Sequence, residues 1–279
     1  MFADMFESII DTANANAKTN DGDYVGEDGL LYCGKCHTRK QAEITIFGQV
    51  RRPMCLCKCE QERLAREEEE RQKREKAEEI KRYRKMGFPE SEMHTWTFER
   101  DDMSNAKLTA AMRRYADNFA ELRRSGKGLL LYGPVGTGKT FAACEVANAL
   151  IDKGYPVLVT NFMRIANIIQ ADFDGRQEYI DSLNEFALLV LDDLGAERGS
   201  AYMQEMVYNI IDSRYRAGLP MIITTNLSIE KIKKTDNMEQ MRIYDRVLER
   251  CHPIEVSGSS KRRKIVRENY EKMKDLLGL

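Results

Sequence analysis

The chain has 279 residues, 32% of them charged, and a formal net charge of −1 at pH 7. This length accommodates one large domain and a smaller one, and the near-neutral total neither indicates nor excludes nucleic acid as a partner. The longest apolar runs are about six residues, far below the ~20 that a membrane-spanning helix needs. Because residues 1–6 also lack the basic start and apolar stretch of a signal peptide, we expect a cytoplasmic protein.

The first 30 residues are polar and mixed, and they allow a short helix at 3–15 followed by a flexible stretch. The next segment, 31–60, holds five of the seven cysteines: Cys33, Cys36, Cys55, Cys57 and Cys59. Between them, residues 41–50 fit a small hairpin with its turn near Phe47-Gly48. In a reducing compartment such clustering argues for metal rather than for disulfides.

The cysteine spacing predicts a zinc-ribbon-like module over 31–60. Two residues separate the first pair of cysteines, which suits a thiolate knuckle on one ion. A tetrahedral zinc ion takes four thiolates, so one of the five is a spare. We favour Cys33, Cys36, Cys57 and Cys59, with Cys55 or His37 as substitutes. A module this short buries little core, so the metal would supply much of its folding energy.

Residues 61–88 are almost wholly charged and predict a helical linker. Three pairs of opposite charge at i, i+4 favour a helix: Glu67/Arg71, Glu70/Arg74 and Glu78/Arg82. Apolar residues are too few for a coiled coil, so we expect a solvated helix, with a partner-docking helix as the alternative. The sequence Met-Gly-Phe-Pro at 86–89 ends it.

The remainder, 89–279, predicts one large α/β domain. Trp96 is expected to anchor the linker on this domain, and apolar residues at helical spacing predict an amphipathic helix over 108–122. Beyond it, strands alternate with helices, which predicts a parallel sheet covered on both faces. The expected strands are 128–132, 156–160, 187–191, 221–225 and 253–256. The expected helices lie near 139–153, 162–172, 176–185, 200–217, 239–250 and 260–276.

A complete phosphate loop lies between the first of these strands and the first of these helices. Residues 133–140 read Gly-Pro-Val-Gly-Thr-Gly-Lys-Thr. Glycines let backbone N–H groups line an anion nest, and the following helix directs its N-terminal dipole at the same phosphates. Lys139 should reach the β and γ oxygens, and the Thr140 hydroxyl should ligate Mg²⁺. The residues expected to bind ATP are Gly133, Pro134, Val135, Gly136, Thr137, Gly138, Lys139, Thr140 and Phe141.

Two acids follow the apolar run at 186–191, as expected at the end of a buried parallel strand. Asp192 should hold the magnesium ion, directly or through water. Asp193 should orient and polarise the attacking water. With the phosphate loop upstream, these acids predict ATP hydrolysis.

Three further features narrow the class of ATPase. The run 220–226 is another buried strand with a polar tip, where Asn226 can hydrogen-bond the attacking water or the γ-phosphate. Arg246 and Arg250 lie four apart on one helix face, and such an arginine can complete a neighbouring subunit's site. A basic cluster at 261–264 starts the final helix.

These segments together resemble the AAA+ ATPases of the DnaC/DnaI helicase-loader and IstB type. The resemblance rests on the phosphate loop and on Leu-Leu-Val-Leu-Asp-Asp-Leu-Gly (188–195), Ile-Thr-Thr-Asn (223–226), Tyr-Asp-Arg-Val-Leu-Glu-Arg (244–250) and Gly-Ser-Ser-Lys-Arg (258–262). The resemblance covers 86–270 strongly and 31–60 more loosely. The cysteine-rich front end is similar to loader-like proteins of phages and mobile elements. It implies an AAA+ P-loop fold, with Asn226 as sensor 1, Arg246 as the arginine finger, Arg250 as its reserve and Arg262 as sensor 2. The chain departs from the common pattern at Asp193, where that pattern has Glu.

The resemblance implies an ATP-dependent loader of the replicative hexameric helicase onto single-stranded DNA. ATP would bridge subunits into a ring or spiral, and the zinc-bearing front end would grip the helicase. Lys261 to Lys264, Arg267 and Arg164 are the candidates for phosphate contacts on DNA. One alternative is an IstB-like transposition helper ATPase that binds duplex DNA and a transposase. The other is an adaptor that binds nucleotide without turnover, motivated by Asp193.

Overall fold

The structure, a computed structural model, describes residues 20–46, 48–172, 174–196, 201–258 and 260–278. It divides into two compact units, Met1–Ala77 and Glu78–Leu279. The helix expected at 3–15 lies outside the described residues. No helix in the described ranges is long and apolar enough to cross a membrane.

The first unit contains two small antiparallel sheets. β1 (Tyr24–Val25) pairs with β2 (Leu31–Tyr32), a pairing that the sequence analysis did not predict. β3 (Ile44–Ile46) pairs with β4 (Gln49–Arg51) and forms the expected hairpin. Gly48 has a φ of 78° at the turn, where a residue without Cβ is unstrained; Phe47 lies outside the described residues.

Helix α2 (Lys58–Gly87) forms where the charged linker was predicted and ends at the expected Met-Gly-Phe-Pro signal. Side chains from 61 to 77 are exposed throughout, which agrees with a solvated helix. Of the predicted ion pairs, Glu70–Arg74 forms at 3.7 Å. The arginines of the other two pairs contact acids at i, i+3 instead, Arg71 with Glu68 and Arg82 with Glu79, within the helix that their spacing predicted. Such exposed pairs are typically worth less than about 1 kcal/mol each, so this exchange of partners does not decide whether the helix forms.

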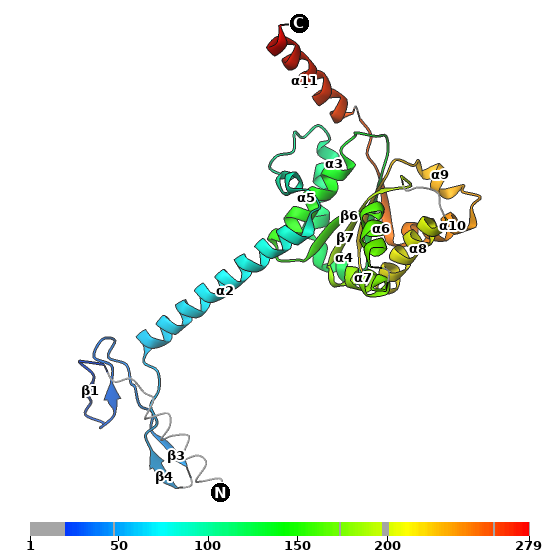
Figure 1. Cartoon of the computed structure of the whole chain (residues 1–279). Coiled ribbons are helices and arrows are strands. Elements are labelled where there is room, and N and C mark those ends of the chain that lie inside the picture. Colours follow the sequence, from blue (N-terminus) through cyan, green and yellow to red (C-terminus); the bar gives the residue numbers. More distant parts are fainter. Residues whose placement is uncertain (1–19, 47, 173, 197–200, 259, 279) are drawn as a thin grey trace. The chain divides into compact units, whose positions relative to one another are not determined.

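The second unit is built on a five-stranded parallel sheet with the order β6-β7-β8-β5-β9 (Figure 1). Its strands are β5 (Gly128–Tyr132), β6 (Val157–Asn161), β7 (Leu188–Leu194), β8 (Met221–Thr225) and β9 (Cys251–Glu255). Each overlaps the strand expected from its apolar run, because strands buried on both faces have continuous hydrophobic sequences. The predicted α/β P-loop fold with a parallel sheet is confirmed.

Helices cover both faces of this sheet (Figure 1). One apolar cluster joins one sheet face to α3 (Ala106–Asp117), α4 (Phe119–Ser125) and α5 (Lys139–Asp152). The other joins the opposite face to α6 (Phe162–Ala171), α7 (Arg176–Ser182), α8 (Ala201–Arg216) and α10 (Met238–Arg250). Neighbouring residues of β5 belong to different clusters, Leu130 to the second and Leu131 to the first, as strand geometry requires. The unit also contains η1 (Ser91–Thr95), η2 (Leu183–Glu185), α9 (Ile229–Lys233) and α11 (Lys261–Leu277).

Two helix predictions need correction. The single helix expected over 108–122 is two helices, α3 and α4, because Asn118 ends the first: its side-chain amide donates to the carbonyl of Arg114 at 2.8 Å. The five-residue α9, capped by the Ser228 side chain, was not predicted. Trp96 packs as expected, with its ring centroid 5.8 Å from that of Phe141, directly after the phosphate loop.

Candidate functional site

The phosphate loop connects β5 to α5, as the sequence predicts. Gly133, Gly136 and Gly138 have φ values of 143°, 84° and 96°, a region that favours glycine. A Cβ on Gly133 would also lie 2.4 Å from the carbonyl oxygen of Val256. The loop therefore depends on its glycines for shape, and it directs its chain into the N-terminus of α5, where an anion is stabilised.

Lys139 is 5% exposed and lies at the centre of this loop. Its Nζ donates to the carbonyl oxygens of Gly133 and Pro134 at 2.9 and 2.8 Å. It also donates to Oδ1 of Asn226 at 2.8 Å, although Asn226 is 87 residues away in sequence. The fold thus brings the loop lysine and the predicted sensor to the same point.

Asp192 lies beside Thr140 at the end of β7. The Thr140 hydroxyl donates to Oδ1 of Asp192 at 2.8 Å. A hydroxyl and a carboxylate from these two elements are the hard oxygen ligands that Mg²⁺ takes alongside phosphate oxygens. The two residues predicted to share the magnesium ion are therefore adjacent, and they fit that ion.

Asp193 has a φ of 59°, which is uncommon for a residue with a side chain. The turn coincides with a shift in the β7–β8 register between Leu191 and Leu194. Asn226 donates from Nδ2 to Oδ1 of Asp193 at 3.2 Å. Asn226 therefore bridges Lys139 and Asp193, and these three residues form one hydrogen-bonded group.

Thr224 is a site residue that the sequence analysis missed. It is fully buried on β8, and its hydroxyl donates to Oδ1 of Asp192 at 2.6 Å. The Thr224 hydroxyl oxygen in turn accepts a hydrogen bond from the backbone N–H of Asp193 at 2.9 Å. One side chain thus fixes both acids. The available signal was the polar pair Thr-Thr before Asn226 at the end of an otherwise apolar strand.

The candidate finger arginines lie on the last two turns of α10. Arg246 has partners within its own chain, including Asp212 and Tyr208. Arg250 stacks over the Tyr215 ring at 4.8 Å and donates to the Tyr215 carbonyl at 3.4 Å. Among the described residues, neither arginine forms a hydrogen bond or an ion pair with the phosphate loop.

The sheet register explains that separation. β5 and β9 are parallel neighbours. Gly128 lies opposite Cys251, and Tyr132 lies opposite Glu255. The phosphate loop follows Tyr132, at the carboxyl edge of the sheet. Helix α10 ends directly before Cys251, at the amino edge. Arg246, about one turn before that end, therefore lies towards the edge opposite its own phosphate loop.

The sensor 2 prediction concerns Arg262, whose side chain lies outside the described residues, as do those of Lys261, Lys264 and Arg267. Arg263 and Arg164 are exposed. Ser260, which caps α11, approaches the phosphate loop: a Cβ on Gly136 would lie 2.2 Å from its Oγ. The start of α11 is thus placed beside the loop.

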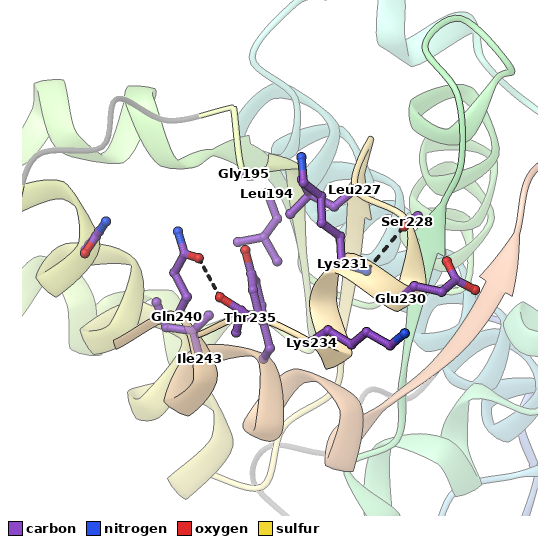
Figure 2. Close-up of a pocket in the computed structure, with 12 residues that line it drawn as sticks. Leu194, Gly195, Leu227, Ser228, Glu230, Lys231, Lys234, Thr235, Gln240 and Ile243 are labelled. Carbon is purple, nitrogen blue, oxygen red and sulfur yellow. Dashed lines mark hydrogen bonds between the residues drawn. The ribbon is translucent and has the colours of Figure 1, made fainter. Parts of the chain in front are cut away.

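A cavity of about 620 Å³ adjoins the site (Figure 2). Its walls come from the residues that directly follow the acids and Asn226, and from α8, α9 and α10. They are Leu194, Gly195, Gln204, Leu227, Ser228, Glu230, Lys231, Lys234, Thr235, Gln240, Ile243 and Tyr244. None of the residues predicted to bind the nucleotide lines this cavity, so it is distinct from the predicted ATP site.

The first unit contains a separate cluster of four cysteines. The sulfur atoms of Cys33, Cys36, Cys57 and Cys59 all lie within 4.8 Å of one another. The Sγ–Sγ distances are 3.4 Å for Cys57–Cys59 and 3.6 Å for Cys33–Cys59. Four thiolates on zinc, with Zn–S bonds of about 2.3 Å, stand about 3.8 Å apart. The set fits a tetrahedral zinc ion.

The other two candidate ligands lie outside this cluster. Cys55 is exposed and its Sγ contacts the carbonyl oxygen of Arg39. His37 is exposed and its Nδ1 lies 3.3 Å from the Tyr24 hydroxyl. The four cysteines that the fold gathers are those favoured from the sequence.

The chemistry of the cluster favours a cation. Hydrogen bonding by the Thr38 hydroxyl lowers the pKa of Cys36 to about 5, which favours a thiolate there. Contacts with its neighbours, Cys57 first, raise the pKa of Cys59 to about 12. A divalent cation bound to the four sulfurs would favour the thiolate form of Cys59 as well.

Known proteins similar to this chain include helicase loaders and a mobile-element protein. The replicative helicase loader DnaI of Bacillus subtilis (strain 168) is 28% identical over 182 residues, which is 60% of this chain and 58% of that protein. A putative ATP-binding protein in an insertion sequence of Mycobacterium tuberculosis is 28% identical over 173 residues, 60% of this chain and 68% of that protein. The chain thus spans less than two thirds of the length of the DnaI protein it matches.

Solved structures show the same fold. A crystal structure of DnaI has a TM-score of 0.52 at 24% identity and covers 62% of this chain and 96% of its own. A crystal structure of the DnaC helicase loader has a TM-score of 0.52 at 23% identity. The match covers 60% of this chain and 100% of the DnaC chain. A family model described as IstB-like ATP binding protein matches residues 55–269. The chain belongs to the family of IstB-like ATP-binding proteins.

Proposed function

We propose that this chain is an ATPase that loads a replicative DNA helicase onto single-stranded DNA. The observation that carries the ATPase is the hydrogen-bonded group around Asn226, which joins Lys139 to Asp193 while Thr140 contacts Asp192. The similarity to DnaI, named a replicative helicase loader, supports the choice of cargo.

Each residue of the group has a defined task. The backbone of the phosphate loop and Lys139 would hold the phosphates. Thr140 with Asp192 would hold a magnesium ion, which would supply positive charge against the charge that develops on the phosphates. Asp193 accepts a hydrogen bond from the attacking water, and Asn226 fixes the direction of that carboxylate. Asp193 is one methylene shorter than Glu, and its left-handed backbone offers a different path for the carboxylate towards the water.

ATP also acts as an assembly signal in this proposal. Arg246 lies towards the amino edge of the sheet and its own phosphate loop at the carboxyl edge, which supports a role in the site of a neighbouring subunit. One subunit would then complete the site of the next, in a ring or spiral. An arginine that stabilises transition-state charge in this way is worth about 10³–10⁵ in turnover.

The first unit is proposed to bind zinc through Cys33, Cys36, Cys57 and Cys59 and to contact the helicase. The zinc would hold the segments around β2 and the start of α2 together, because a unit of this size buries little apolar surface. Exposed apolar side chains on the same unit supply contact area for a protein partner: Tyr24, Val25, Ile44, Val50 and Leu56.

Co-purification with the replicative helicase of the source cell tests the proposal. We expect capture of the helicase that requires ATP and is lost when residues 1–85 are deleted. A matched variant, Lys139→Ala, keeps the first unit and removes the lysine that binds phosphate. Absence of capture by the intact chain, with ATP and without it, would contradict the loader.

An IstB-like transposition helper is the second candidate, because the insertion-sequence protein is 28% identical to this chain, as DnaI is. That function requires binding to duplex DNA and to a transposase. A chain that binds duplex DNA with ATP and does not bind the helicase would favour it. A third reading, an adaptor without turnover, is removed if phosphate release exceeds background and Asp193→Ala abolishes it.

A further inference from the structure

The helix pair α8–α10 contains one nearly buried carboxylate, that of Asp212. Its side chain is 12% exposed. Oδ1 lies 2.7 Å from Nε of Arg246, an ion pair by distance that lacks the angles of a hydrogen bond. Oδ2 lies 2.8 Å from Nε of Arg216. The carboxylate is thus shared by two arginines, one on each helix. A buried acid needs such partners, since an unpaired charge there is costly.

Tyr208 holds the remainder of the Arg246 head group. Nη2 of Arg246 donates to the Tyr208 hydroxyl at 2.9 Å, and the guanidinium carbon lies 4.7 Å from the centre of that ring. Nη1 donates to the carbonyl of Arg242 at 3.2 Å. These contacts fix the plane and the direction of the guanidinium, while the side chain keeps 23% exposure.

The second arginine matters for the charge of the group. A guanidinium paired with a single carboxylate presents little net field to a distant phosphate, because the two charges nearly cancel. Arg216 is 74% exposed and pairs with the same carboxylate. Asp212, Arg216 and Arg246 together carry a net charge of +1, so Asp212 orients Arg246 without removing the positive charge that a γ-phosphate would meet.

We propose that Asp212, together with Tyr208, is a positioning residue for Arg246 and holds its guanidinium in the direction required by the nucleotide site of a neighbouring copy. This inference rests on the proposed function, in which Arg246 acts between subunits. An ion pair that only fastened α8 to α10 would affect stability. A positioning residue affects the turnover of the neighbouring site and leaves ATP binding by its own chain unchanged.

Mixed assemblies separate these two roles. Asp212→Asn alone should lower ATP turnover about 10–100-fold, the size of effect that a misplacement of about 1 Å can produce, with ATP affinity retained. Lys139→Ala has a defective phosphate loop and an intact Arg246. An equimolar mixture of the two should recover turnover well above their sum, since Lys139→Ala subunits supply a correctly held arginine. Asp245→Asn is the matched control on α10, because Asp245 is exposed, and it should turn over ATP like the wild type.

Arg246→Ala mixed with Lys139→Ala distinguishes the possible failures. If that mixture recovers and the Asp212→Asn mixture does not, the proposal for Asp212 is overturned and the inter-subunit arginine stands. If the Arg246→Ala mixture does not recover, the inter-subunit role in the proposed function fails and this inference fails with it. If Asp212→Asn does not fold, Tyr208→Phe provides the same test: it keeps the ring and loses the hydroxyl, and unchanged turnover would overturn the proposal.

Discussion

Replacing Thr224 with valine should separate the geometry of the two acids from the stability of the fold. The substitution keeps the shape of the side chain and removes one hydroxyl, which donates to Asp192 at 2.6 Å and accepts from the Asp193 backbone at 2.9 Å. Because Thr224 is fully buried, the N–H of Asp193 loses its partner away from water. Such a loss typically costs about 1–3 kcal/mol of stability. In a domain of this size, each kcal/mol lowers Tm by about 2–4 °C.

The same change should have a larger effect on catalysis. Thr224 fixes the Asp192 carboxylate, so its loss should raise the Mg²⁺ concentration needed for half-maximal turnover or lower kcat by about 10–100-fold, as is typical when a group supporting a metal ligand is removed. Phosphate release measured against Mg²⁺ concentration at saturating ATP gives both quantities.

Thr225→Val is the matched control. Thr225 is also fully buried, and its hydroxyl donates to the carbonyl of Leu194 at 2.6 Å without contacting either acid. We expect the two variants to lose comparable stability and only Thr224→Val to change the Mg²⁺ dependence. Equal Mg²⁺ profiles for both variants and the wild type would refute the assignment of Thr224 to the site.

Three further predictions concern the two sites. Lys139→Ala should lose ATP binding and turnover while keeping its fold, which equilibrium binding and circular dichroism measure; retained full activity would contradict the assignment of the nucleotide site. Asp193→Ala should bind ATP as the wild type does and lose phosphate release, and turnover within twofold of wild type would exclude Asp193 as the residue that activates water. Metal analysis should find one zinc per chain, lost in Cys57→Ser and retained in the matched variant Cys55→Ser, since Cys55 lies outside the cluster; equal zinc content in both variants would contradict the ligand set.

The sequence predicted the sheet and the phosphate loop because both are encoded locally. Strands buried on both faces are continuous apolar runs, and the loop needs its glycines, lysine and threonine at fixed spacing in one segment. The sequence also favoured the four cysteines that the fold gathers. A tetrahedral site takes four of the five, but the spacing alone left open which cysteine is the spare.

Features that depend on contacts between distant segments were not predictable. The contacts of Thr224 depend on how β7 pairs with β8, including a register shift that the sequence does not indicate. The sequence showed only that a polar Thr-Thr pair ends an apolar strand. The partner of Arg246 is Asp212, on another helix and 34 residues away by sequence numbers. The break between α3 and α4 depends on a single capping asparagine within an otherwise uniform helical pattern.

Helicase delivery tests the central claim most directly. The measurement is unwinding of a forked DNA substrate by the replicative helicase of the source cell. The fork carries a single-stranded segment on which that helicase does not assemble by itself. We predict that the wild-type chain with ATP starts unwinding and that Lys139→Ala does not. Equal unwinding with the wild type, with Lys139→Ala and without either would contradict the account.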